Sequence, residues 1–319
     1  MTRSRGIWVL ADERQGNRSQ VIGVAKALKQ PFLIKEIRYN WLACIPNILL
    51  GASFASATRE TRLILPPPWP RLVISAGRRT GPIARAIKRK SGGSVRLIQI
   101  MNPGSGAEEF DLIALPTHDL PTHGKNTMSI VGAPNELNEQ ELLCAYDYWH
   151  DKLCNLTKPR IALVVGGSTR RRVFSDRMAR ELGEQVANMA RSLGGTVMLT
   201  TSRRTGGAAT ELINALDCPK RVFLWGDYKE NPYKGFLALA DMIIVTGDSV
   251  SLCSEACSTP APVYIYAPEG LISPKHKRFL DQLIQNGHAR IFCGQFDSAF
   301  CLRLNTAAKI ASEIERRFF

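Results

Sequence analysis

The sequence lacks the short motifs that assign a chemistry most directly. Its eight cysteines include no C-x-x-C pair and no Cys/His cluster with zinc spacing, and its five histidines form no H-E-x-x-H pattern. No strand-like run is followed by G-x-G-x-x-G, and no glycine-rich turn ends in G-K-S or G-K-T. These absences count against a metal site, an NAD-dependent dehydrogenase or epimerase, and a P-loop NTPase. The cysteines stand mostly in apolar contexts, which favours a reducing cytoplasm.

Long unbroken hydrophobic runs are missing as well. Residues 41–58 (WLACIPNILLGASFASAT) carry no charge over 18 positions, but Pro46, Asn47 and Gly51 make the stretch too polar and too broken to span a bilayer. Two interpretations remain open for it. It is either an ordinary core helix, expected over residues 42–56, or an interfacial contact with a membrane, which the surrounding basic charge favours.

Acidic residues are scarce in the first hundred positions, which hold 4 Asp/Glu against 18 Lys/Arg and so carry the whole formal net charge of +14. Such a surplus suggests a nucleic acid, an anionic membrane surface or a phosphorylated small molecule as partner, although a solvated basic surface explains it equally well. Nucleic acid is disfavoured because interleaved aromatic residues and recognisable motifs are absent. We therefore expect an anionic membrane surface as the partner of the N-terminal part.

Strand-like and helix-like segments alternate along the whole chain, which predicts an α/β protein with parallel sheets covered by helices on both faces. The polar segment CNLTKPR, residues 154–160, separates two halves of similar size. We predict two Rossmann-like domains facing each other across a cleft. The N-terminal domain is expected over residues 1–156 and the C-terminal domain over residues 157–303, followed by a last helix in residues 304–319.

Ligands of such sheets bind beyond the carboxyl ends of the strands, so the polar residues that follow each strand are the candidates. Asp12 and Glu13 follow the first strand, where a general base would stand, but turn and cap chemistry also explains them. After the third strand, Gly77, Arg78 and Arg79 open a helix whose N–H groups suit an anion. A capped surface helix is an equally good interpretation there.

The segment VVGGSTRRR, residues 164–172, is more specific. Gly166 and Gly167 end a buried strand and let the backbone approach a ligand closely. Ser168 and Thr169 are expected at a helix N-terminus, and Arg170 begins a run of three arginines there. Cations at a helix N-terminus oppose the macrodipole, so a bound phosphate or diphosphate explains them better than helix stability does.

The segment TTSRRTG, residues 200–206, repeats the theme with Ser202 and Arg203 after the next strand. Both clusters are compatible with solvated loops. Two Ser/Thr-Arg clusters at adjacent strand ends nevertheless favour one shared anion site.

The segment TGDSVSLCSEA, residues 246–256, places many small polar groups at the start of a helix, with Glu255 one to two turns inside it. It is an N-cap by Asp248 or Ser249, a redox site, or a ligand cradle. The redox interpretation is the weakest, because Cys253 and Cys257 lie one turn apart with no basic partner between them.

Several of these segments together resemble a known family. VVGGST and GFLALADMIIVTGDSVSLCSEACSTPAPVYIYAP resemble GT-B glycosyltransferases, and distantly the N-acetylglucosaminyl transferase of peptidoglycan lipid-intermediate synthesis. DERQGNRSQ, TSRRT, NPYKGFLALAD and TGDSVSLCSEA are similar to the elongated-mitochondria (mitochondrial fission) family and its bacterial glycosyltransferase-like members. The resemblance covers nearly the whole chain, with the motifs in the expected order.

This resemblance implies a GT-B fold and a metal-independent glycosyltransferase without a cofactor, acting peripherally at the cytoplasmic, inner face of the membrane. The C-terminal domain would bind a nucleotide-sugar donor as substrate, the N-terminal domain a lipid-linked or cell-envelope glycan acceptor, and the last helix would cross back to the first domain. The residues implied to contact the diphosphate are Gly166, Gly167 and Ser168 from one strand end and Thr246, Ser249 and Ser251 from the other, with Glu255 on the ribose hydroxyls.

The resemblance also leaves a second function open. Family members often carry a histidine after the first-strand glycine, where this chain has Asn17, so Asp12 and Glu13 remain the candidates for the catalytic base. Plant members are linked to recruiting a dynamin-like protein. The alternative function is therefore a non-catalytic, membrane-peripheral adaptor that kept the fold.

Overall fold

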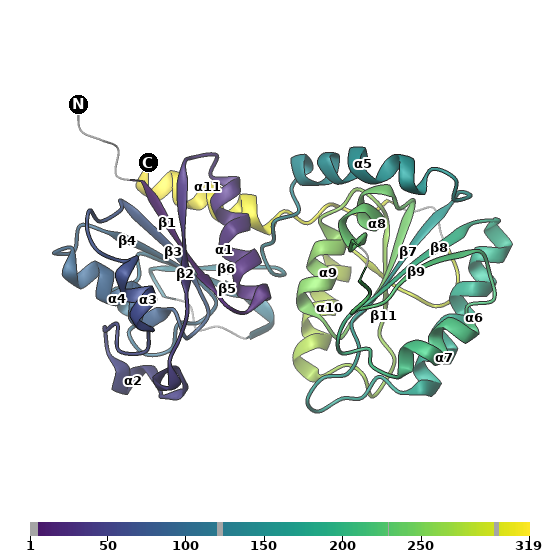
Figure 1. Ribbon diagram of the computed structural model, residues 1–319, viewed down its shortest axis with the longest axis horizontal. Coiled ribbons are helices and arrows are strands. Elements are labelled where there is room, and N and C mark those ends of the chain that lie inside the picture. The colour runs from purple at the N-terminus through teal and green to yellow at the C-terminus, as the bar shows by residue number, and fades with distance from the viewer. Residues whose placement is uncertain (1–5, 120–123, 229, 297–299) are drawn as a thin grey trace. The chain divides into compact units, whose positions relative to one another are not determined.

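The computed structural model describes residues 6–119, 124–228, 230–296 and 300–319. The chain divides into two compact units: Met1–Glu136 together with Asn305–Phe319, and Leu137–Leu304. Each unit is built on its own sheet of six strands, and all pairs of adjacent strands in the described residues are parallel (Figure 1).

The sheet of the first unit has the order β2-β1-β3-β4-β5-β6. Its strands are β1 (Ile7–Asp12), β2 (Phe32–Ile37), β3 (Leu72–Ala76), β4 (Arg96–Ile100), β5 (Leu112–Pro116) and β6 (Thr127–Ile130). Its helices are α1 (Gln15–Ala27), α2 (Asn47–Leu50), α3 (Arg59–Leu63), α4 (Gly81–Lys90) and α11 (Thr306–Phe318), with 3₁₀ turns η1 (Trp41–Cys44), η2 (Ala107–Glu109) and η3 (Thr117–Asp119).

The core of the first unit follows from the alternation of side chains along buried strands. In β1, Ile7 and Val9 pack in one cluster with apolar residues of α1 and α11, whereas Trp8 and Leu10 pack in another with residues of α4. Helices therefore cover both faces of this sheet, as Figure 1 shows.

The sheet of the second unit has the order β12-β11-β10-β7-β8-β9. Its strands are β7 (Arg160–Val165), β8 (Thr196–Thr201), β9 (Lys220–Phe223), β10 (Met242–Thr246), β11 (Val263–Tyr266) and β12 (Arg290–Ile291). Its helices are α5 (Glu139–Leu153), α6 (Asp176–Leu193), α7 (Ala208–Ala215), α8 (Tyr233–Leu239), α9 (Val250–Cys257) and α10 (Pro274–Gln285). The order is that of a doubly wound Rossmann sheet.

The division between the units differs from the predicted boundary near residue 156. Helix α5 packs on α8 of the second unit, where a Cβ atom on Gly235 would lie 2.3 Å from Cγ of Trp149. Lys234 on α8 also pairs with Glu141 on α5 at 2.7 Å. The polar segment at residues 154–160 is thus the connection from α5 to β7, and the units divide before α5. The last helix, α11, packs with α1 in the first unit.

The helix predicted over residues 42–56 is wrong. The chain forms only η1 and the four-residue α2 there, because Pro46 stands before α2 and Gly51 ends it at a φ of +57°. The segment is a loop closed at its base by a bridge between Tyr39 and Ala57, with the Asn40 N–H donating to the Ser56 carbonyl at 3.0 Å. We call residues 40–56 the apolar loop.

Candidate functional site

The strand order reverses once in each sheet, and such switch points are where open α/β sheets bind ligands. In the second unit the reversal lies between β7 and β10, which pair from Met242↔Ile161 to Val245↔Val164. In the first unit it lies between β1 and β3. The residues beyond these strand ends therefore define two candidate regions, one in each unit.

The turn after β7 requires glycine at two consecutive positions. A Cβ atom on Gly166 would lie 2.4 Å from Oδ2 of Asp248, and one on Gly167 would lie 2.3 Å from the backbone oxygen of Arg204. Gly167 also has a φ of +119°, a conformation open essentially to glycine alone. Thr246 at the end of β10 accepts a hydrogen bond of 2.8 Å from the Gly166 N–H and so joins the two strand ends.

Arg204 and Asp248 form an ion pair over this turn, with Nη1 of Arg204 2.6 Å from Oδ2 of Asp248. The Asp248 side chain is fully buried, and neither carboxylate oxygen accepts a hydrogen bond from the described residues. Nη1 of Arg204 also donates to the carbonyls of Gly167 (3.3 Å) and Ser168 (3.2 Å). One third of the Arg204 side chain is exposed, so the ion pair is open to solvent on the side of Arg204.

The predicted helix N-terminus at Ser168 and Thr169 is wrong. Helix α6 begins at Asp176, and the cap is Ser175, whose hydroxyl accepts from the Met178 N–H at 3.2 Å. The intervening loop folds on itself, since the Phe174 N–H donates to Oγ of Ser168 at 3.0 Å and the Thr169 N–H donates to the Arg172 carbonyl at 2.8 Å. Arg170 is exposed in this loop rather than placed on a helix.

The loop after β8 supplies the second wall of the β7 turn. Ser202 and Thr205 both donate their hydroxyls to the Gly166 carbonyl, Thr205 at 2.9 Å. Arg203, the predicted site residue, is exposed, whereas Arg204 reaches the glycine turn. The repeated Ser/Thr-Arg pattern thus located the right loop, but it could not distinguish two consecutive arginines.

Helix α9 carries the remaining predicted residues. Its N-cap is Ser249, which accepts from the Leu252 N–H at 3.4 Å, and Ser251 lies half-buried in its first turn. Glu255 accepts a hydrogen bond of 2.6 Å from the hydroxyl of Tyr233, the first residue of α8. Burial and the Glu255 carboxylate raise the pKa of Tyr233 well above its ordinary value, so its hydroxyl remains a donor.

Tyr233 was not singled out from the sequence, although it stands in the quoted motif NPYKGFLALAD. The cysteines of α9 are packing residues, as predicted: Cys253 and Cys257 are buried, and burial raises the pKa of both thiols.

In the first unit, Asp12 is buried at the end of β1 and is held by three donors. They are the Arg14 N–H at 3.0 Å, the side-chain amide of Asn17 at 2.8 Å and the guanidinium of Arg79. Glu13 is about half exposed, and one of its oxygens lies 3.7 Å from Nη1 of Arg79. Glu13 is therefore the more accessible of the two predicted carboxylates.

Arg78 serves the structure of the apolar loop rather than an open anion site. Its guanidinium donates to the carbonyls of Ile45 (2.8 Å) and Ala43 (2.9 Å), and buried Asn47 donates back to the Arg78 carbonyl at 2.8 Å. Arg79, its neighbour, stacks on the ring of Tyr39 with 4.4 Å between Cζ and the ring centroid. Together these contacts attach the apolar loop firmly to the end of β3.

The described residues contain neither a membrane-spanning helix nor a cluster of metal-ligating side chains. None of the helices found there is long and apolar enough to cross a membrane. Among the same residues, no group of three or more His, Cys, Asp or Glu side chains is placed to hold a metal ion.

Solved structures of GT-B proteins share the fold of this chain. The crystal structure of Acinetobacter baumannii MurG matches with a TM-score of 0.52 at 12% identity, covering 98% of this chain and 99% of that chain. The structure of UDP-GlcNAc 2-epimerase from Methanocaldococcus jannaschii matches with a TM-score of 0.55 at 12% identity, again covering 98% and 99%. The protein therefore has a GT-B fold, which confirms the predicted fold class.

Sequence relatives identify the family. The family model for mitochondrial fission ELM1 matches residues 15–318. The protein RP120 of Rickettsia prowazekii (strain Madrid E) is 30% identical over 346 aligned positions, which cover 97% of each chain. Mitochondrial fission protein ELM1 of Arabidopsis thaliana is 30% identical over 273 positions, covering 77% of this chain and 64% of the plant protein. The chain belongs to the mitochondrial fission ELM1 family, as the sequence resemblance predicts.

Proposed function

We propose that this protein is a glycosyltransferase that moves a sugar from a nucleotide-sugar donor to a lipid-linked or cell-envelope glycan acceptor, without a metal or a cofactor. The observation that carries the proposal is the glycine turn after β7, over which buried Asp248 fixes Arg204 at the switch point of the sheet. A guanidinium held at such a strand end suits the diphosphate of a nucleotide. Structures of UDP-GlcNAc 2-epimerases on the same fold contain UDP-GlcNAc and UDP, which supports a donor of this kind.

The second unit would contribute to the reaction by electrostatic stabilisation of the leaving group. As the bond between sugar and diphosphate breaks, negative charge develops on the leaving phosphate, and a preorganised cation stabilises it more than water does. Arg204 is preorganised because Asp248 and two carbonyls hold its Nη1. Glu255, oriented by Tyr233, would accept hydrogen bonds from the ribose hydroxyls.

The proposed hydrogen bonds from the ribose hydroxyls to Glu255 predict a loss of nucleotide affinity in the Glu255→Gln variant. The amide removes the charge that strengthens hydrogen bonds from ribose, so we expect UDP or GDP to bind at least about ten-fold more weakly. Titration calorimetry measures this, with Glu184→Gln, an exposed carboxylate of α6, as the matched control. Equal affinities in the two variants would remove Glu255 from the site.

We propose Glu13 as the general base that deprotonates the acceptor hydroxyl, because Asp12 is already occupied by three donors. Glu13→Gln should lower kcat for sugar transfer by about 10²-fold or more while leaving nucleotide affinity unchanged. Release of nucleoside diphosphate from a nucleotide-sugar, with a membrane lipid extract as acceptor, measures kcat. An unaltered kcat would show that a group other than Glu13 is the general base.

We further propose that the first unit binds the cytoplasmic, inner face of an anionic membrane through the apolar loop. Trp41, Ile48 and Leu49 are 76%, 74% and 76% exposed, although the loop beneath them is held by Asn47 and Arg78. The loop carries no charge, whereas the exposed Arg38 and Arg59 flank its closed base. Apolar side chains backed by cations are the composition that anionic bilayer surfaces attract.

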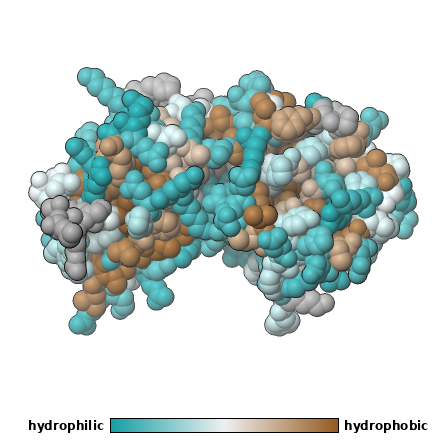
Figure 2. Space-filling model, turned by 90° about the horizontal axis from the view of Figure 1, so that it is seen from above, coloured by the Kyte–Doolittle hydropathy of each residue, from teal (hydrophilic) through white to brown (hydrophobic). Residues whose placement is uncertain are grey.

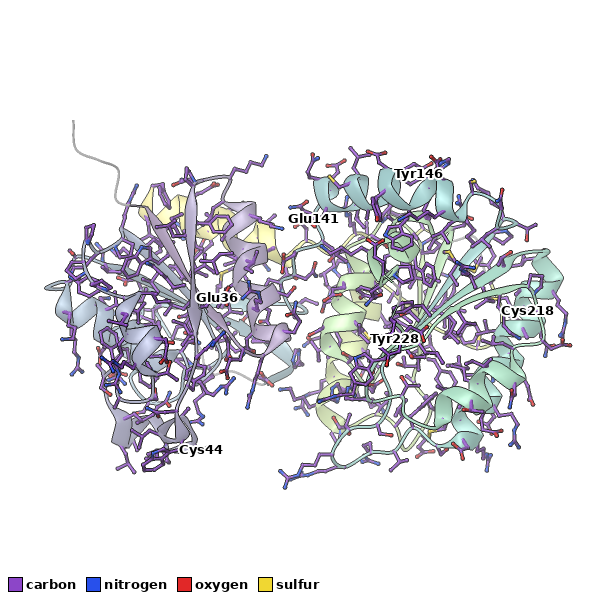
Figure 3. The ribbon with its side chains drawn as sticks, viewed as in Figure 1. Glu36, Cys44, Glu141, Tyr146, Cys218 and Tyr228 are labelled. Carbon is purple, nitrogen blue, oxygen red and sulfur yellow. The ribbon has the colours of Figure 1, made fainter. Side chains whose placement is uncertain are left out.

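Exposed apolar side chains are common on both units, as the brown groups in Figure 2 show, and singly they need no explanation. The apolar loop differs because three large exposed apolar residues, Trp41, Ile48 and Leu49, lie within nine positions of one uncharged loop. Cys44 of η1, labelled in Figure 3, lies in this loop, in the same region of the first unit as α2 in Figure 1.

This proposal predicts that the double variant Ile48→Ser/Leu49→Ser loses binding to anionic vesicles. Each side chain is worth roughly 1.5–3 kcal/mol when fully buried in an apolar phase, so the partition coefficient should fall at least about ten-fold. Co-sedimentation with vesicles of phosphatidylglycerol and phosphatidylcholine tests it, with Leu143→Ser on α5, a leucine exposed to 53% outside the loop, as the control. Unchanged co-sedimentation would refute the loop as the contact.

A second candidate function is a non-catalytic, membrane-peripheral adaptor that recruits a dynamin-like partner. The observation that favours it is that three hydrogen-bond donors already hold the Asp12 carboxylate. Asp12 therefore lacks the freedom that a general base needs to accept a proton. Enzymatic turnover of a nucleotide-sugar distinguishes the two functions. An adaptor would release no nucleoside diphosphate from any nucleotide-sugar, with or without acceptor, even if it binds nucleotide.

A further inference from the structure

The backbone donors expected to hold a phosphate at the β7 turn are largely occupied. The Gly166 N–H donates to Thr246, and the Ser168 N–H donates to the Arg204 carbonyl at 2.9 Å. Asp248 offsets part of the charge of Arg204, so the pair offers a ligand less than a full positive charge. An anion at this turn therefore needs a further donor from another element.

Helix α10 lies against the end of β10. A Cβ atom on Gly247, the residue before Asp248, would lie 2.7 Å from Cδ1 of Leu280 and 3.1 Å from Cδ1 of Ile272. His276 stands in the first turn of α10, one turn before Leu280 on the same face of the helix. Its imidazole is half-buried, and the charges of Asp248 and Arg204 both act on its pKa.

Ser273 contacts one of the two ring nitrogens of this imidazole. Oγ of Ser273 accepts from the backbone N–H of His276 at 3.2 Å and lies 2.7 Å from its Nδ1. When the Ser273 hydroxyl donates to Nδ1, the ring proton lies on Nε2, and Nε2 is the nitrogen left for a ligand.

The ring is also kept neutral. Burial lowers the pKa of His276; Asp248 opposes this, and the charges of Lys275 and Arg204 add to the lowering. At neutral pH the side chain is thus neutral, with Nδ1 against the Ser273 hydroxyl and Nε2 as its other ring nitrogen.

We infer that His276 is a phosphate-binding residue, donating its Nε2–H to a phosphoryl group that the Arg204 guanidinium also contacts. That the phosphoryl group belongs to the diphosphate of a nucleotide-sugar rests on the proposed function. The same chemistry would also bind inorganic pyrophosphate.

The test compares His276→Ala with His276→Gln, whose amide N–H lies near the position of Nε2 and preserves the donor. Titration calorimetry with UDP, GDP and inorganic pyrophosphate should show a loss of affinity of about ten-fold or more in His276→Ala, since hydrogen bonds to charged groups have this value. His276→Gln should restore most of it. His150→Ala, a partly exposed histidine of α5, is the control, and equal thermal midpoints show that the variants fold.

The outcomes separate the inference from the proposed function. If UDP and GDP bind wild type and His276→Ala equally, the inference is wrong and the nucleotide site stands. If pyrophosphate alone binds, and binds through His276, the inference holds and the nucleotide-sugar function falls. If none of the three probes binds, both are overturned. Nitrogen-15 spectra of the free protein add a ligand-independent readout, because a proton on Nδ1 would also contradict the inference.

Discussion

Substitution of Gly167 by valine is expected to abolish nucleotide binding and to lower the free energy of unfolding by about 2–5 kcal/mol. Two costs add at this position. The φ of +119° is strained for any residue with a Cβ, and the new atom would lie 2.3 Å from a backbone oxygen and 2.5 Å from the Thr205 nitrogen, neither of which a rotamer change can relieve. Urea denaturation measures the stability and titration calorimetry the binding.

The matched control for this variant is Gly207→Ala, six residues beyond the β8 strand end. Gly207 precedes α7 with a φ of −62°, and nothing lies within 4 Å of an added Cβ. It should be neutral or stabilising by roughly 0.4–1 kcal/mol, because alanine restricts the unfolded chain. Similar losses in both variants would show that the glycine turn has no special geometry.

Removal of the Arg204 side chain is the second change with a large expected effect. In Arg204→Met the buried Asp248 carboxylate loses its counter-ion, which costs about 3–5 kcal/mol for a fully buried pair. Because one third of Arg204 is exposed, we expect the lower end of that range, with nucleotide affinity lost as well. Arg203→Met, one position earlier and exposed, should change stability by less than about 0.5 kcal/mol.

A double variant identifies the cause of that loss. Asp248→Asn removes the buried charge, so Arg204→Met/Asp248→Asn should recover much of the stability lost in Arg204→Met while remaining unable to bind nucleotide. If the double variant were no more stable than the single one, an unpaired carboxylate would not explain the effect.

The fold was predictable because its signal is local. Buried strands such as β7 and β10 are continuous apolar runs, and the small polar residues that follow them mark the carboxyl ends. Family motifs then narrowed the fold to GT-B. The unit to which α5 belongs was harder to predict from the sequence, because its contact with α8 joins residues about ninety positions apart. The polar segment after α5 also resembles a linker between domains.

The site was predictable to the level of the loop but not of the residue. Ser168 and Ser175 are both good N-caps, and only the contact between Ser168 and the Phe174 N–H decides that the helix begins after the second. Arg204 differs from Arg203 in its contacts with Asp248 and with the Gly167 and Ser168 carbonyls, which lie more than thirty residues away in sequence. His276 and Tyr233 stand in segments whose chemistry depends on which strand end they face.

Titration calorimetry of the purified protein with UDP-, GDP- and CMP-linked sugars tests the central claim most directly. The account predicts that at least one of these donors binds wild type and Arg203→Met with equal affinity and fails to bind Arg204→Met. The absence of binding to every donor, or binding that survives the loss of Arg204, would contradict a nucleotide-sugar site at the glycine turn.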